Sequence, residues 1–385
     1  MIPVTIRDRV EILDRMEPLV AEWQHLAQHC NVCPFLWPGW IGSWWRAFGK
    51  GRLQVFAAYQ NGRLAGILPM RRYSGVLSSP TNSETPVYGF VAANESAVTQ
   101  LVDALISQKA RRIDLCSLRP PVAGVSQARA PADASGYRVL TKPTRTSPYV
   151  TIEGTSWEEY ESGLRRKLRS EIRRRRRRLE DKGRLTLEVF DGKEGLDELL
   201  DEGFRVEGSG WKDAEGTSIN ARPATRRFYT EVAHWAAERG LLRMAFLRLD
   251  GKALAFDYCF EYNRTHYLVK TGYDSAYGRF APGMVMRYLM LERAFFEGLN
   301  TYDFLGAFDS WKQEWTATSR ELQSLHMFAP TGSGFLDQAT FVGVRAISRR
   351  AKSLACSPML PEGGRLMLQQ AHANWQRYLR RKRTS

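Results

Sequence analysis

Residues 241–263, LLRMAFLRLDGKALAFDYCFEYN, contain two apolar runs on either side of Asp250-Gly251. An Asp-Gly pair fits a two-residue turn in which both central residues have positive φ, so the segment predicts a β-hairpin. A second segment of this kind, LQVFAAYQNGRLAGILPMRR at 53–72, surrounds Asn61-Gly62. The two turns are 189 residues apart along the chain.

The same spacing of 189 residues recurs outside the hairpins, where it relates turn glycines, Tyr-Gly pairs and strand aspartates. Both halves also predict the order helix, hairpin, helix and strand. These elements fall at 36–49, 53–72, 96–109 and 112–118, and again at 223–239, 241–263, 283–298 and 301–305. We therefore predict an α/β (α+β) fold with a mixed sheet, made of two similar units in tandem.

Composition shifts suggest where the units begin and end. We expect a degenerate first unit at 1–150, a second unit at 151–330 with a basic helical arm at 164–180, and a helical tail at 331–385. The first unit should open with a strand at 3–7 and a helix near 11–29. Residues 119–135, rich in Pro, Ala and Gly, predict a loop or connector.

Composition also limits the class of protein. The 385 residues are 43% hydrophobic and 25% charged, which is typical of a soluble globular protein. No window of 18 apolar residues occurs and the N-terminus mixes charges into every turn, so a cytoplasmic protein is expected. Cys30 and Cys33 form a CxxC, but no second Cys/His pair at comparable spacing follows. We therefore expect no metal site.

Almost all of the net charge of +15 lies in two short segments. Residues 165–184 contain twelve basic and three acidic residues, and 377–385 contain five more basic residues. The run Arg165–Arg178 places Leu164, Leu168 and Ile172 on one stripe of a helix with arginines on the other faces. An anionic membrane surface or another polyanion is favoured as its partner over a merely solvated face. The near-neutral remainder disfavours specific DNA binding.

The second unit differs from the first at one informative place. Its last helix is preceded by GRFAPGMVMRYLM, with Pro282-Gly283 at the helix start, whereas the first unit has GFVAANESAVTQL there. A helix N-terminus binds phosphate only where the backbone can come close to the anion. We therefore expect the second unit to bind the ligand. The sequence has no GxxxxGK[ST], GxGxxG, GxSxG or HExxH motif, which disfavours the commonest nucleotide hydrolases, dinucleotide enzymes, serine hydrolases and zincins.

Further candidates cluster between 204 and 315. Asp303 ends an apolar strand, where its carboxylate could serve as a base or be a structural group bound by backbone N–H. Lys312 could hold a phosphate or carboxylate, or could be an ordinary surface lysine. The remaining polar and aromatic candidates of this region are Trp211, Lys212, Tyr273, Asp274, Tyr277 and Arg279.

The order of these motifs resembles a known family. The basic helix RRKLRSEIRRRRRRLEDKG is followed by SGWKDAEGTS, KTGYDSAYGRFAPG and YDFLGAFDSWKQEW. This order, over about 155–328, resembles the CelD-type acetyltransferases associated with cellulose biosynthesis, within the GNAT superfamily. The tandem layout is also similar to the Fem-type aminoacyltransferases of peptidoglycan synthesis.

The resemblance implies site residues and a donor. Arg279, Pro282, Gly283 and Met284 correspond to the loop that binds the donor pyrophosphate in GNAT proteins, with Pro282 standing where the first glycine of the usual pattern would be. Lys312 falls where Fem-type proteins keep a lysine for the donor phosphate. The implied donor is acyl-CoA, such as acetyl-CoA, and the implied acceptor is an amine or a hydroxyl.

The sequence therefore predicts a GNAT-type N-acyltransferase of cell-envelope polysaccharide or related biosynthesis, cytoplasmic or peripheral to the inner face of the membrane. Asp303 or Asp274 would take the proton, and Trp211, Lys212, Tyr273 and Tyr277 would line the acceptor side. Two alternatives stay open. One is a Fem-like transferase that uses aminoacyl-tRNA, and the other is a non-catalytic scaffold for envelope assembly.

Overall fold

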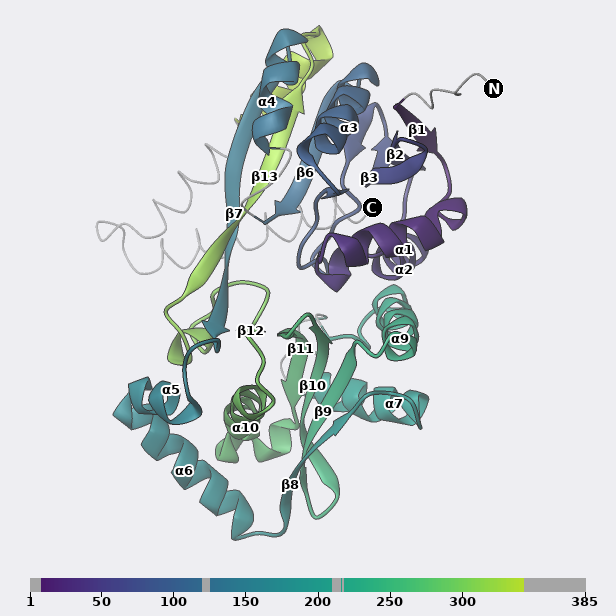
Figure 1. Ribbon diagram of the computed structural model, residues 1–385. Helices are drawn as coiled ribbons and strands as arrows, with labels where there is room; N and C mark the ends of the chain where they lie inside the picture. Colours follow the sequence, from purple (N-terminus) through teal and green to yellow (C-terminus); the bar gives the residue numbers. More distant parts are fainter. Residues whose placement is uncertain (1–7, 120–124, 210–215, 217, 343–385) are drawn as a thin grey trace, which may run out of the picture.

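The computed structural model describes residues 8–119, 125–209, 216 and 218–342 (Figure 1). Its strands form one mixed sheet in the order β1-β2-β3-β4-β6-β13-β7-β12-β11-β10-β9-β8, with β5 paired to β3. One half of this sheet belongs to the first unit and the other half to the second. The fold is thus α/β with two similar units in tandem and a basic helical arm, as the sequence predicts.

The first unit begins at the edge strand β1. It contains β1 (Arg9–Leu13), α1 (Val20–His29), α2 (Pro38–Phe48), β2 (Arg52–Gln60), β3 (Arg63–Tyr73), β4 (Val76–Ser78), β5 (Val91–Ala92), α3 (Glu95–Ser107), β6 (Arg112–Leu118) and α4 (Val125–Ala134). Short 3₁₀ turns precede α1 and α2, at Glu17–Leu19 and Pro34–Leu36.

The second unit repeats this order after two additional helices. It contains α5 (Trp157–Gly163), α6 (Arg166–Glu180), β8 (Leu185–Phe190), α7 (Leu196–Glu207), α9 (Pro223–Glu238), β9 (Leu242–Leu249), β10 (Lys252–Tyr262), β11 (Thr265–Tyr273), α10 (Pro282–Phe296) and β12 (Thr301–Asp303). A 3₁₀ turn, η3 (Ser275–Phe280), leads into α10, and another, η4 (Lys312–Glu314), follows β12.

The predicted repeat is visible in the strand register. β4 pairs in parallel with β6 through Val76 and Arg112, and β11 pairs in parallel with β12 through Thr265 and Thr301. Both residues of the second pair lie 189 positions after their counterparts. The hairpin turns also match, because Asn61-Gly62 and Asp250-Gly251 all have positive φ. Both hairpins therefore have the turn that their sequences predict.

Two long strands join the units. β7 (Arg138–Thr151) pairs with β13 (Ser319–Phe328) along most of its length, and its last three residues pair with β12. β13 also pairs with β6, so a strand that follows the second unit in sequence completes the sheet of the first. In Figure 1 this pair of strands runs along one side of both units. The second unit is therefore inserted between β7 and β13.

Two local predictions are wrong. The helix expected near 11–29 begins only at Val20, and residues 11–13 instead belong to β1, which pairs with the edge of β2. Residues 125–134, expected in a loop, form α4 despite Pro131. Ala128 and Ala132 lie one helical turn apart and are both buried, so small side chains supply the packing face. The expected strand at 3–7 lies outside the described residues.

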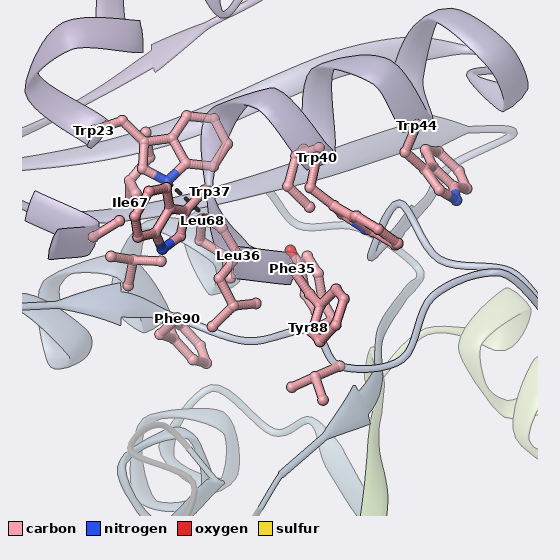
Figure 2. Packing of buried hydrophobic residues seen from close by; sticks show 14 of the residues in the cluster. Trp23, Phe35, Leu36, Trp37, Trp40, Trp44, Ile67, Leu68, Tyr88 and Phe90 are labelled. Atoms are coloured by element: carbon pink, nitrogen blue, oxygen red, sulfur yellow. Dashed lines mark hydrogen bonds between the residues drawn. The ribbon is translucent and has the colours of Figure 1, made fainter. Parts of the chain in front are cut away.

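The tryptophan-rich helix α2 packs between the two units. Trp40 contacts the rings of Phe228 on α9 and Phe260 on β10, with ring centroids 5.0 and 5.9 Å apart. Trp37 contacts Trp235 on α9, with centroids 6.2 Å apart. Figure 2 shows Trp37, Trp40 and Trp44 among the buried side chains around α2. The tryptophans in and next to α2 therefore belong to the core that joins the units.

This packing predicts opposite effects for two glycines of α2. A Cβ atom at Gly39 would lie 2.1 Å from Nε1 of Trp235, whereas one at Gly42 would lie 3.3 Å from the flexible end of Arg46. We expect Gly39→Ala to lower the free energy of unfolding by about 1–3 kcal/mol, because the indole ring must move. Gly42→Ala should raise it by up to about 1 kcal/mol, because alanine favours the helix.

Denaturant unfolding of both variants measures this difference. Equal effects of the two substitutions would contradict the close approach of α9 to α2.

Candidate functional site

The two parallel strands of the second unit part after a short pairing. β12 pairs only with the first three residues of β11, and the last pair joins Tyr267 to Asp303. Leu305 and Gly306 then have positive φ, and the chain turns away from the sheet. Within the described residues, 268–273 of β11 therefore have no strand partner on the β12 side. An extended ligand can add to a strand edge of this kind.

A β-bulge lies next to this point. On the other edge of β11, Leu268 pairs with Cys259 and Lys270 pairs with Tyr258, so Val269 is an extra residue. Bulges increase the local twist and change the direction of the side chains that follow, and they are frequent beside functional sites. Here the bulge bends β11 where it leaves β12. No residue pattern in the sequence indicates it.

The helix that follows β11 begins without a side-chain cap. Ala281, in the left-handed region at φ 49°, precedes Pro282 at the first turn of α10. The equivalent helix α3 is capped, because the Asn94 side chain accepts a hydrogen bond of 2.9 Å from the Ala97 N–H. The two helices thus differ as their sequences predict. The N–H groups at the start of α10 are not taken by a side chain.

The candidate donor loop surrounds this helix start. A Cβ at Gly283 would lie 3.4 Å from the ring of Tyr273, so the exposed tyrosine lies across the first turn. Arg279 is exposed, with its guanidinium 4.8 Å from the ring of Phe280, and Met284 is partly buried beside the core under α10. The structure therefore brings Tyr273, Arg279 and Pro282–Met284 together.

Asp274 and Tyr277 shape the turn before α10. Asp274 accepts a hydrogen bond from the Ala276 N–H at 3.0 Å and caps η3. Its other oxygen lies 3.3 Å from Nζ of Lys252, which also lies 4.7 Å from the centre of the Tyr277 ring. No motif in the sequence singles out Lys252, which follows the Asp250-Gly251 turn. Asp274 therefore stabilises the turn that precedes α10.

The basic arm α6 packs on this same region. Leu168, Ile172 and Leu179 are buried in the core beneath α10, and an Arg175 guanidinium N–H donates to the Arg279 carbonyl. Most of the other cations of α6 are exposed, namely Arg166, Lys167, Arg173, Arg174, Arg176, Arg177 and Arg178. Glu171 pairs with Arg174 and Arg175, and Glu180 pairs with Arg176. The arm therefore places an excess of positive charge next to the start of α10.

Asp303 lies on the opposite side of the gap between β11 and β12. It is fully buried, and its carboxylate accepts hydrogen bonds from Arg119 at 2.8 Å and from the Leu305 N–H at 2.9 Å. Arg320 lies 3.7 Å from the same carboxylate. Arg119 belongs to the first unit, so this carboxylate links the two units. Neither arginine carries a motif that sequence reasoning could have used.

Lys312 is buried and its ammonium bonds to the backbone. Nζ donates to the Leu305 and Ala307 carbonyls at 2.8 and 2.9 Å and lies 3.7 Å from Asp309. Burial lowers the pKa of Lys312 to about 8, although Asp309 acts in the opposite direction. Lys312 therefore holds the turn that carries the chain away from β12. Trp211 and Lys212 lie outside the described residues.

Two ion pairs lie next to β11. One is within the second unit, and the other connects β11 to the first unit. Arg287 of α10 is buried and bonds to Asp257 at 2.9 Å, and it also donates to the Tyr302 hydroxyl. On the other side, Glu84 from the first unit lies 2.8 Å from Lys270 of β11. Burial alone would raise the pKa of Glu84, but Lys270 holds it below its ordinary value. The sequence indicates neither pair.

Within the ranges that the structure describes, no three His, Cys, Asp or Glu side chains form a group that could hold a metal ion. Cys30 and Cys33 are free thiols. Over the same ranges, no helix has the length and apolar character needed to cross a bilayer.

Comparison with known proteins agrees with this architecture. Residues 166–313, from α6 through Lys312, match the family model of the acetyltransferase (GNAT) domain. A search of curated proteins found no match.

Solved structures resemble the whole tandem arrangement. FemX is 15% identical, with 82% of this chain and 96% of that chain covered and a TM-score of 0.54. The C-terminal domain of a protein described as a lysylphosphatidylglycerol synthetase from Agrobacterium fabrum is 12% identical, with 85% and 97% covered and a TM-score of 0.55. These identities show a shared fold. Residues 166–313 thus match a GNAT-type domain, and the chain as a whole shares the fold of these two structures.

Proposed function

We propose that the protein is an N-acyltransferase whose second unit binds an acyl-CoA donor and whose acceptor, an amine or a hydroxyl, enters from the side of the first unit. The observation that carries this proposal is the difference between the two equivalent helices. Asn94 caps the start of α3, whereas α10 begins without a side-chain cap beside the part of β11 that extends beyond its pairing with β12. The match of 166–313 to the GNAT acetyltransferase domain supports it.

The donor would bind in two parts. Its pyrophosphate would lie at the start of α10, bound by the backbone N–H of Gly283 and by Arg279. Pro282 and Met284 would line the site without donating, because Pro282 has no N–H and the Met284 N–H donates to the Ala281 carbonyl at 3.0 Å. Its extended arm would follow the edge of β11 beyond Tyr267, because backbone groups there can pair with amide groups of the donor. Lys312 would contribute by holding the turn after β12, with its charge on the protein side of the donor.

The chemistry then needs positioning, a proton acceptor and stabilisation of the oxyanion. The acceptor nitrogen or oxygen attacks the thioester carbonyl and the C–S bond breaks. The sulfur takes up the proton that the acceptor loses, so the coenzyme leaves as a thiol. Backbone N–H groups near the bulge at Val269 would stabilise the oxyanion. Of the two candidate carboxylates, Asp303 lies where the strands part, whereas Asp274 caps the turn before α10. Asp303 is fully buried and bonded to Arg119, so we assign it the positioning of the acceptor side and Asp274 the formation of the turn, and the acceptor's proton passes to the leaving thiolate.

The acceptor would be a component of cell-envelope biosynthesis. The supporting facts are the resemblance to CelD-type acetyltransferases and the fold shared with FemX and with a domain of a protein described as a lysylphosphatidylglycerol synthetase. Tyr273 and Tyr277 would line the acceptor side of this site. Trp211 and Lys212 would line it as well. The reaction would take place in the cytoplasm or at the inner face of the membrane.

A second candidate function uses aminoacyl-tRNA as the donor. The observation in its favour is the exposed positive charge of α6 next to Arg279, because a row of arginines exceeds what one coenzyme A phosphate needs. A tRNA donor would extend from the start of α10 over this helix. Its binding would then depend strongly on salt.

Titration calorimetry with acetyl-CoA and longer acyl-CoAs tests the first candidate. Wild-type protein should bind at least one of them. Gly283→Trp should weaken binding by tenfold or more, because the indole covers the N–H groups at the start of α10. The matched control is Ser96→Trp, which places the same side chain on the first turn of α3, where the residue is exposed. The proposal fails if the wild type binds no acyl-CoA, or if both variants bind equally.

Copurifying RNA tests the second candidate. Replacement of Arg173–Arg178 by glutamine should remove bound RNA and flatten the dependence of RNA affinity on salt concentration, because fewer phosphates are neutralised. The control replaces the five basic residues of 377–383 by glutamine. The ratio of absorbance at 260 and 280 nm and filter binding at several salt concentrations give the readout. RNA-free wild-type protein with no affinity for tRNA would exclude this candidate.

A further inference from the structure

Two arginines meet at the carboxylate of Asp303. Arg119 follows β6, and Arg320 lies on β13; their guanidinium nitrogens are 2.8 and 3.7 Å from this carboxylate. The side chain of Asp303 is fully buried, whereas those of Arg119 and Arg320 keep 21% and 26% of their surface exposed. A solute can therefore reach the cations but not the carboxylate.

The charges at this point do not balance. Burial raises the pKa of the Cys33 thiol and of the Tyr267 hydroxyl, so both neighbours are uncharged at neutral pH. Asp303 is then the one anion that the described residues place against Arg119 and Arg320. Burial also lowers the pKa of Arg320, and the positive charge of Arg119 adds to this effect while Asp303 opposes it. Among the described residues, one positive charge is left without a counterion.

Hydrogen-bond donors are also left over. Arg119 uses one terminal nitrogen for Asp303, while its Nε is buried and has no hydrogen-bond partner. The guanidinium of Arg320 stacks on the ring of Tyr149, with its centre 3.9 Å from the ring centroid, and its contact with Asp303 is longer than a hydrogen bond. Each guanidinium has five N–H donors in a planar fork that fits carboxylate and phosphate oxygens.

A structural ion pair elsewhere in the chain looks different. Arg248 lies between two carboxylates, Glu188 at 2.8 Å and Glu202 at 2.7 Å, so no positive charge is left over there. A purely structural link between the two units would need only the ion pair of Arg119 and Asp303. Arg320 adds a second cation where the link does not require one. This excess points to a missing anion.

We propose that Arg119 and Arg320 bind an anionic group of the acceptor, a carboxylate or a phosphate. The inference rests on the proposed function, because it takes the first unit's side as the acceptor side. Asp303 is paired with Tyr267 at the last step before β11 and β12 part. An acceptor anchored there can extend its nucleophile toward a thioester on β11. When the acceptor's anionic group is bound, that group and Asp303 together balance the charges of Arg119 and Arg320.

Thermal unfolding and equilibrium dialysis with inorganic phosphate and with acetate, at constant ionic strength, test the site. We expect at least one anion to raise the Tm of the wild type by about 2–3 °C. Arg320→Met should weaken the binding of that anion by about tenfold, because the fork and its charge are lost. The larger shift identifies the anionic group as phosphate or carboxylate.

The matched control is Arg9→Met. Arg9 also stacks on a tyrosine, 4.6 Å from the Tyr59 ring, and pairs with a carboxylate, Glu11, but lies at the edge of the first unit. This variant should keep the anion-dependent shift. Arg320→Lys is a second test variant that keeps the charge and loses the fork, so its anion binding should also be weaker than that of the wild type.

The outcomes separate this inference from the proposed function. Gly283→Trp should retain the anion-dependent shift, because the start of α10 is a different site. If the shift is lost in Gly283→Trp but kept in Arg320→Met, the anion binds at α10 and the inference is overturned. If no anion raises the Tm while acyl-CoA still binds, the inference also fails and the proposed function stands.

Discussion

The architecture depends on the contact of α2 with the second unit. Trp37 and Trp40 pack against aromatic side chains of α9 and β10, so one hydrophobic core extends across both units. This contact fixes the distance between the end of β6 and the end of β12. The pairing of Arg119 with Asp303 and of Glu84 with Lys270 requires that distance. Nonpolar burial thus positions the charged groups on which the proposed chemistry relies.

Duplication followed by divergence accounts for the different starts of the two equivalent helices. Both units keep the strand register and the turns, which are needed for packing. They differ at the helix that follows the parallel strand, where Asn94 closes one helix start and Pro282-Gly283 leaves the other without a side-chain cap. The first unit then contributes side chains to the shared face instead of a second donor site.

Local signals in the sequence predict much of the fold. The Asn-Gly and Asp-Gly turns, the stripe of α6 and the end of β12 at Asp303 depend on neighbouring residues, so they could be identified. The helix α4 could not, because its buried residues are alanines and it contains Pro131. In the candidate site, the helix start at Pro282 was recognisable. The partners Arg119 and Arg320 were not, since residues far apart in sequence meet only through the tertiary fold.

The position of β13 has a consequence for how the chain folds. The gap between β6 and β7 is filled by residues 319–328, so the sheet of the first unit cannot close until the ribosome has made the whole second unit. Contacts of such long sequence separation slow folding and leave strand edges exposed during synthesis. The two units are therefore similar in fold but must mature together, with the later one completing the earlier.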